Sequence, residues 1–93
     1  MEKYFTYVIC SEVDGRYYYG QTSNLEKRIE DHNKGASTYT KRYLPWKLVA
    51  YKAVETRSEA MKIEKQLKNC KSKEKVNAFI VRHGFQKVIG PEK

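Results

Sequence analysis

Cysteine, proline and long apolar runs are all scarce in this sequence of 93 residues. Its two cysteines, Cys10 and Cys70, are too few for a disulfide framework and lack metal-ligand spacing, so we expect buried free thiols in a reducing, cytoplasmic setting. No stretch approaches the length of a membrane span, and residues 1–10 lack the apolar run and small-residue cleavage site of a secretory signal. The sequence also shows no internal repeat, linker or low-complexity segment. These absences leave a small globular domain.

Acidic residues are also in short supply. Eleven Asp and Glu stand against 19 Lys and Arg, which leaves a net charge of +8 spread over the whole length. A surplus of that size favours a polyanionic partner, because each contacted phosphate releases counterions. A basic protein with a merely solvated surface is the alternative. The eight tyrosines favour the first interpretation, because they exceed what so small a core needs and phenols suit wet, phosphate-facing surfaces.

Alternating side chains predict three strands. Residues 4–10 alternate aromatic and β-branched side chains, an Asp-Gly turn follows, and residues 16–21 resume the same texture, which is the pattern of a β-hairpin. A polar stretch at 36–46 reads as a loop, and residues 48–54 return to strand character. The first two strands are therefore expected to lie side by side.

Capping residues and apolar spacing predict three helices. Ser23 and Thr56 each precede a glutamate by three residues, the pattern of a capping box, in which hydroxyl and carboxylate satisfy free amides at a helix start. Ser72 is a further candidate cap, and Gly35 and Gly84 are expected to end the first and last helices. The expected helices cover residues 24–34, 57–70 and 73–83.

The order of these elements, β-β-α-β-α-α, implies an α+β fold with a small three-stranded antiparallel sheet flanked by helices. We expect one domain over residues 1–84 and a C-terminal tail over 85–93. Three apolar residues of that tail could pack back on the body: Phe85, Val88 and Ile89.

Arg28 and His32 are candidate functional residues of the first predicted helix. They are four residues apart, so their side chains emerge on one face about a turn from each other and could share an anion. Three acidic residues lie on the same helix, so an ordinary charged surface is the alternative. The hairpin favours a site, because pairing across a tight turn can bring Tyr7 and Tyr18 together.

Strand alternation divides the tyrosine triplet of the second strand. Tyr17 and Tyr19 are expected on one face of the sheet and Tyr18 on the other. Packing is the alternative role for all three rings. Only one side of the triplet can therefore serve a site.

Short motifs follow one another in order from residue 4 to about residue 80. Residues 5–7 read Phe-Thr-Tyr and residues 18–20 read Tyr-Tyr-Gly. The later blocks contain Leu25, Arg28, His32, Asn33 and Gly35, then Tyr39-Thr40-Lys41, Pro45-Trp46, Leu48-Val49, Ser58-Glu59-Ala60, Glu64 and Lys68. In this order the chain resembles the GIY-YIG nuclease superfamily, and more narrowly its small single-domain members.

The resemblance implies a hydrolytic site made of Tyr7, Tyr18, Arg28, His32, Glu64 and Asn77. Glu64 would be the sole protein carboxylate on a divalent metal, Mg²⁺ or Mn²⁺, with water and substrate oxygens completing the shell. Arg28 would clamp the scissile phosphate, and Tyr7, Tyr18 and His32 would handle the attacking water. Asn77 corresponds to an asparagine that family members often place near the site. From the residues alone, Glu64 among its lysines also fits a surface ion pair.

Two features of this site bear on chemistry and fit. A free phenol titrates near pH 10, so a tyrosinate base at neutral pH needs its pKa lowered by about three units, or about 4 kcal/mol. Arg28, His32, nearby lysines and a metal could supply that, or else the phenol only positions a water whose proton leaves through another group. Phe5 stands where the family has glycine, which affects substrate fit more than chemistry.

The sequence therefore predicts a metal-dependent endonuclease that hydrolyses DNA phosphodiester bonds, contacts DNA mainly through its phosphate backbone and serves DNA repair or recombination. The rival prediction is a nucleic-acid-binding module of the same fold that does not cut, using aromatic stacking and backbone contacts. A purely structural protein would leave the charge of +8 without a purpose. The lone carboxylate of Glu64 favours the nuclease, because a binder has no need of it.

Overall fold

A computed structural model describes residues 3–36 and 38–88. The elements in chain order are β1 (Tyr4–Ser11), β2 (Tyr17–Thr22), α1 (Leu25–Asn33), the short 3₁₀ helix η1 (Thr40–Tyr43), β3 (Trp46–Val54), α2 (Arg57–Lys68), α3 (Lys73–Arg82) and β4 (Gln86–Lys87). The strands form one antiparallel sheet in the order β2-β1-β3-β4. The predicted α+β class and the three helices are confirmed, and the sheet has one short strand more than expected.

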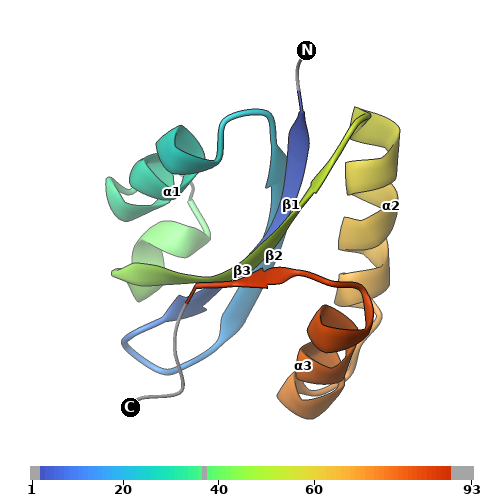
Figure 1. The fold of residues 1–93 in the computed structure, drawn as a ribbon. Coiled ribbons are helices and arrows are strands. Elements are labelled where there is room, and N and C mark those ends of the chain that lie inside the picture. Colours follow the sequence, from blue (N-terminus) through green and yellow to red (C-terminus); the bar gives the residue numbers. More distant parts are fainter. Residues whose placement is uncertain (1–2, 37, 89–93) are drawn as a thin grey trace.

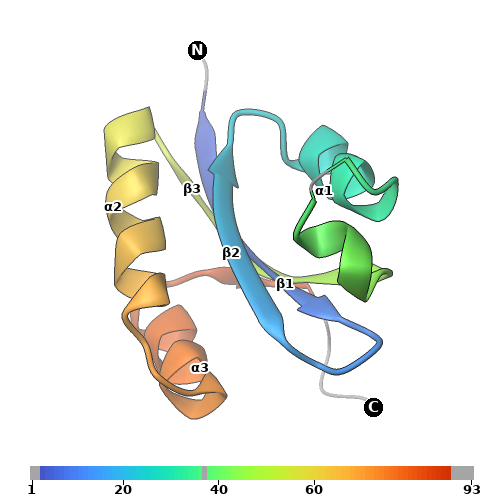
Figure 2. The ribbon, with the colours of Figure 1, turned by 180° about the vertical axis from the view of Figure 1, so that it is seen from behind.

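The helices lie on both faces of the sheet. In Figure 1, α1 and η1 cover one face, while α2 and α3 cover the other. Figure 2 looks onto β2, which runs along an edge of the sheet between α2 on one side and α1 with η1 on the other. In the described part of the chain, no helix has the length and apolar character needed to cross a membrane.

Each face of the sheet carries its own apolar core. Val8 and Ala50 point toward α2 and α3, where they pack with Leu67, Val76 and Ile80. A second set gathers under α1 and η1 and consists of Tyr7, Ile9 and Trp46 with partly buried Tyr18, Leu25, Ile29, Tyr43, Leu44, Leu48 and Tyr51. Full burial of one large aliphatic side chain contributes about 1.5–3 kcal/mol. Successive side chains of β1 point to opposite faces of the sheet, so this one strand contributes to both cores and packs against both helical layers.

Side-chain caps begin all three α-helices, with one shift from the predicted positions. Thr56 and Ser72 cap α2 and α3 as expected, accepting from the amides of Glu59 at 3.1 Å and Lys75 at 3.2 Å. At α1 the cap is Asn24, which accepts from the amide of Lys27 at 3.2 Å, so the prediction of Ser23 was wrong by one residue.

Part of the stretch predicted as a loop, 36–46, forms regular structure: residues 40–43 are a 3₁₀ helix, and several hydrogen bonds hold residues 38–46 to the rest of the domain. The Ser11 hydroxyl donates to the carbonyl of Tyr43 at 2.8 Å, and the Trp46 indole donates to the carbonyl of Thr40 at 2.7 Å. Asn33 then accepts from the Trp46 amide at 2.7 Å and donates to its carbonyl at 3.0 Å. These contacts fold η1 against β1 and start β3 at Trp46, two residues earlier than predicted.

The segment after α3 adds to the body of the domain. Phe85 is buried, and β4 pairs with β3, where the Val88 amide donates to the carbonyl of Val49 at 2.9 Å. The predicted tail, 85–93, is thus described as far as Val88, and Ile89 lies outside the described residues.

The two cysteines are free, as the sequence predicts. Cys10 and Cys70 are, however, partly exposed rather than buried. Cys10 lines a pocket between the sheet and α3, and Cys70 lies in the connection from α2 to α3, beside α3.

Candidate active site

The hairpin places the two predicted tyrosines on one face of the sheet. In the register of β1 and β2, Tyr7 lies opposite Gly20 and Ile9 lies opposite Tyr18. Directly opposed residues share a face, so Tyr7 and Tyr18 are diagonal neighbours under α1. Tyr17 packs into the other core, as alternation predicts.

Gly20 makes room for the ring of Tyr7. A Cβ built on Gly20 would collide with the Tyr7 hydroxyl and lie only 2.6 Å from its Cζ. The ring therefore crosses β2 above the one residue that has no side chain, and its hydroxyl reaches toward the outer edge of the sheet. This contact gives the glycine of the second motif a steric reason.

A buried hydrogen-bonded chain starts at that hydroxyl. The Tyr7 Oη lies 2.9 Å from Nε2 of His32, and Nδ1 of His32 lies 2.9 Å from Oγ1 of Thr40. All three side chains are almost fully buried. The sequence placed Thr40 in a motif block but assigned it no role, since only the folding of η1 brings it to the histidine.

The surroundings keep both the phenol and the imidazole neutral. Burial raises the pKa of Tyr7 above 10.0, and the nearby Arg28 guanidinium opposes this only in part. Burial, with the charge of Arg28, lowers the pKa of His32 from 6.5 to about 4. Arg28 does lower the pKa of Tyr7, as predicted, but desolvation outweighs the guanidinium, and an uncharged imidazole adds no positive charge. That a bound metal would lower this pKa further stays a prediction.

Glu64 approaches the same edge from the opposite layer. It lies on α2, which runs beside β2 on one face of the sheet, while α1 lies on the other face (Figure 2). Its charge raises the pKa of Tyr7, so its carboxylate lies near that phenol. The Glu64 side chain is 19% exposed, and its Oε2 lies 2.9 Å from Nζ of Lys68. The ion pair foreseen as an alternative is thus present, at the margin of the site.

Asn77 lies apart from this group. It sits on α3, where its Oδ1 accepts from the Tyr17 hydroxyl at 3.4 Å. Tyr17 points away from Tyr18, so Asn77 belongs to the opposite face of the sheet, in a cleft that it shares with Cys10 and Lys73. The structure therefore does not bring the sixth predicted residue to the other five.

The donor set suits one hard cation held partly by a substrate. Among the described residues, no three His, Cys, Asp or Glu side chains are grouped so as to hold a metal ion. Glu64 offers a single carboxylate with partial exposure. Mg²⁺ commonly binds in this way, through one or two carboxylates, waters and substrate phosphates. The residues present thus fit such an ion, provided that Lys68 releases the carboxylate.

Comparison with known proteins agrees with this fold. The family model described as the GIY-YIG catalytic domain matches residues 3–77, so the chain belongs to the GIY-YIG family, a nuclease family.

Its relatives within this family are small proteins. The chain is 44% identical to the UPF0213 protein YsiG of Lactococcus lactis over 66 residues, which cover 69% of this chain and 62% of YsiG. It is 36% identical to the UPF0213 protein SSP2268 of Staphylococcus saprophyticus, over 82% of this chain and 93% of that protein. The solution structure of the UPF0213 protein BH0048 of Bacillus halodurans is similar, with a TM-score of 0.54, 29% identity and coverage of 88% and 87%. The chain is therefore a small single-domain member of the UPF0213 type.

Proposed function

We propose that this protein is a metal-dependent endonuclease that hydrolyses phosphodiester bonds of DNA. One observation carries the proposal: the Tyr7 hydroxyl lies 2.9 Å from Nε2 of His32, and the charges of Arg28 on α1 and Glu64 on α2 both act on the pKa of that phenol. Phosphodiester hydrolysis needs a cation for the phosphate, a group that orients water and a carboxylate for a metal. A packed structural core needs none of these.

In the proposed reaction, water attacks phosphorus in line as the bond to the leaving oxygen breaks, and no covalent enzyme intermediate forms. The attacking water releases one proton to solvent, and the leaving oxygen takes up a proton from solvent. Arg28 contacts the scissile phosphate and stabilises the charge that develops on its oxygens. Tyr7 is a protonated phenol held by His32, so its part is to orient the attacking water rather than to act as a resting tyrosinate. A divalent metal held by Glu64 would supply Lewis-acid stabilisation of that charge.

The ion pair of Glu64 with Lys68 favours a second candidate, a DNA-binding module that does not cut. A carboxylate neutralised by an ammonium at 2.9 Å attracts a cation less strongly, and a basic surface binds phosphates without a metal. The two candidates differ in whether the charge of Glu64 matters for turnover.

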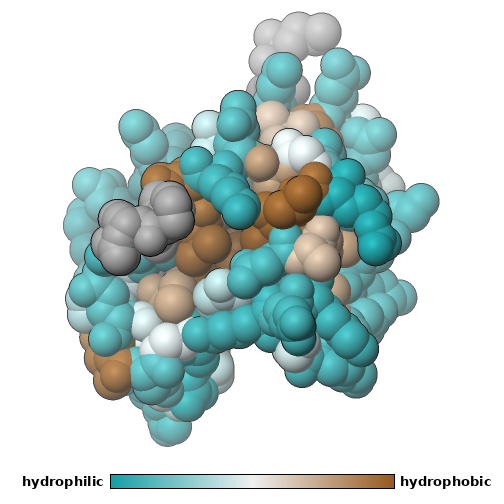
Figure 3. Space-filling view, turned by 60° about the horizontal axis from the view of Figure 1, so that its bottom comes forward, coloured by the Kyte–Doolittle hydropathy of each residue, from teal (hydrophilic) through white to brown (hydrophobic). Residues whose placement is uncertain are grey.

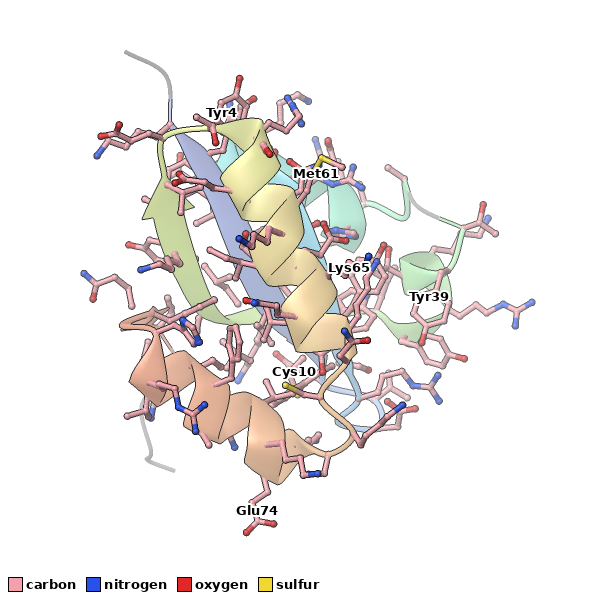
Figure 4. The ribbon with its side chains drawn as sticks, turned by 90° about the vertical axis from the view of Figure 1, so that its right-hand side faces the viewer. Tyr4, Cys10, Tyr39, Met61, Lys65 and Glu74 are labelled. Atoms are coloured by element: carbon pink, nitrogen blue, oxygen red, sulfur yellow. The ribbon has the colours of Figure 1, made fainter. Side chains whose placement is uncertain are left out.

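Replacement of Glu64 by glutamine tests the choice, because Glu64→Gln keeps size and helix propensity but removes the charge. We expect turnover with Mg²⁺ or Mn²⁺ to fall about a hundredfold or more, while DNA affinity with chelator stays within about twofold. Glu74→Gln is the matched control. Glu74 lies in the first turn of α3, and Figure 4 shows its side chain projecting from that helix into solvent.

The substrates for this test are single-stranded, duplex and branched DNA, each with metal and with chelator. Binding without cleavage of any of them would select the module that does not cut. Metal-dependent cleavage that Glu64→Gln leaves unchanged would mean that the metal is held elsewhere.

A further inference from the structure

An exposed aromatic stack extends outward from the candidate active site. Tyr39, the residue before η1, stacks on Tyr18 with ring centroids 5.6 Å apart and planes at 27°. Tyr18 in turn meets the edge of His32 at 5.4 Å. Tyr39 is 44% exposed, and it is the only aromatic among the large exposed apolar residues of 3–36 and 38–88. Figure 4 shows it beside η1, away from α2 and α3.

Neighbouring side chains hold the ring of Tyr39 in place. Tyr43 lies 5.3 Å from it, and the Arg16 guanidinium lies 3.8 Å above the ring of Tyr43. Arg16 also donates from Nη1 to the Tyr39 hydroxyl at 3.2 Å and pairs with Asp14 at 2.8 Å. A side chain fixed in this way loses little conformational entropy when a ligand covers it.

The surroundings of the stack are cationic. Lys41 and Arg42 follow on η1, and both are exposed. Aromatic faces combined with basic side chains are the usual means of holding unpaired nucleotides, because the cations follow the phosphates while the bases stack. A duplex presents no free base face to such a ring.

We propose that Tyr39 is a stacking platform for one unpaired base of the DNA substrate, next to the scissile phosphate. Its placement beside the cut rests on the proposed nuclease function, whereas the stacking itself does not. Tyr39 then acts as a specificity-determining residue. It favours single-stranded or frayed DNA over duplex and discriminates little between bases, since every base has a π-face.

Binding measured without turnover tests this proposal. Fluorescence anisotropy in chelator would compare an end-labelled oligothymidine, an abasic phosphate backbone of equal length and a duplex. We expect Tyr39→Leu to weaken oligothymidine binding about tenfold, and to change binding of the other two less than about twofold, because only a base can lose a stacking partner. Tyr39→Phe keeps the ring without the hydroxyl and should bind like wild type.

Two controls keep the outcome clear. Val13→Ala alters another exposed apolar residue, on the β1–β2 turn, and should leave all three affinities unchanged. Thermal melting of each variant checks the fold, and a conservative Tyr39→Trp variant should retain binding even if Tyr39→Leu melts early. An equal loss on oligothymidine and abasic backbone would overturn the proposal, as would no loss at all.

The two proposals fail separately. If the ring-dependent preference is present but no DNA is cut with metal, the stacking inference stands and the nuclease function fails. If DNA is cut with metal and Tyr39→Leu leaves both base-dependent binding and strand preference unchanged, the nuclease function stands and the stacking inference is wrong.

Discussion

His32 is a buried side chain whose two ring nitrogens both have partners, Tyr7 on one side and Thr40 on the other. Burial, and then the charge of nearby Arg28, lowers the pKa of His32, so the imidazole stays neutral. One of its nitrogens then donates a hydrogen bond and the other accepts one. The charge state of this residue therefore links the site to the stability of the protein.

The pH dependence of the free energy of unfolding should reflect the protonation of His32. Its pKa is about 4 in the folded protein against 6.5 ordinarily, so between these pH values the unfolded chain binds a proton that the folded protein does not. The free energy of unfolding should be greatest above pH 6.5 and should fall as the pH drops toward 4, by about 2 kcal/mol at pH 5. Urea denaturation at pH 7, 6 and 5 measures this.

Two variants separate His32 from the rest of the protein. His32→Gln should flatten the dependence between pH 7 and 5, whereas His83→Gln, at the other histidine, should keep it. If His32→Gln retains the full wild-type slope, the neutral, buried imidazole is not its cause.

Sequence reasoning reached part of this residue-level arrangement. Strand alternation and a tight turn were enough to place Tyr7 and Tyr18 on one face of neighbouring strands, because both are local rules. The link from His32 to Thr40 was not accessible, because it depends on how η1 folds back across the sheet. The raised pKa of Tyr7 depends in the same way on tertiary burial.

At the scale of elements, the predicted helices are close to those observed because their signals are local. Caps and apolar spacing act within a turn or two, so α2 and α3 begin where Thr56 and Ser72 predict. η1 and β4 were missed because distant contacts form them, including the Ser11 bond to the Tyr43 carbonyl and the burial of Phe85.

The shifted cap of α1 gives a direct test. Asn24→Ala should lower the free energy of unfolding by about 1 kcal/mol, because the Lys27 amide loses its acceptor. Ser23→Ala should change it by less than about 0.5 kcal/mol, since Ser23 is exposed and does not cap the helix. Urea titrations of both variants against wild type measure the difference. If Ser23→Ala lowered the free energy of unfolding more than Asn24→Ala, Ser23 would be the cap, as the sequence predicts.

At the scale of the whole molecule, positive charge is the dominant surface property. The net charge is +8, and the face in Figure 3 is largely hydrophilic around a central apolar band. The basic residues are distributed along the whole sequence rather than gathered in one tail. Long-range attraction of this kind does not depend on base sequence.

DNA binding should therefore weaken steeply with salt. For duplex DNA, a plot of log K against log salt should have a slope of about −0.9 for each phosphate contacted, and for single strands about −0.7. Anisotropy titrations between low and physiological salt, in chelator, give these slopes. A binding constant that does not change with salt, or no binding at low salt, would contradict binding through the DNA phosphates.

Gly20 has no side chain, so the residues allowed at position 20 on β2 and at position 7 on β1 depend on each other. The ring of Tyr7 occupies the space that any Cβ at Gly20 would need. A relative that keeps the tyrosine but carries a larger residue opposite it must hold its phenol somewhere else. A relative that has lost both is free of this restriction. Related sequences can thus be sorted by whether the pair is inherited together, before any of them is assayed.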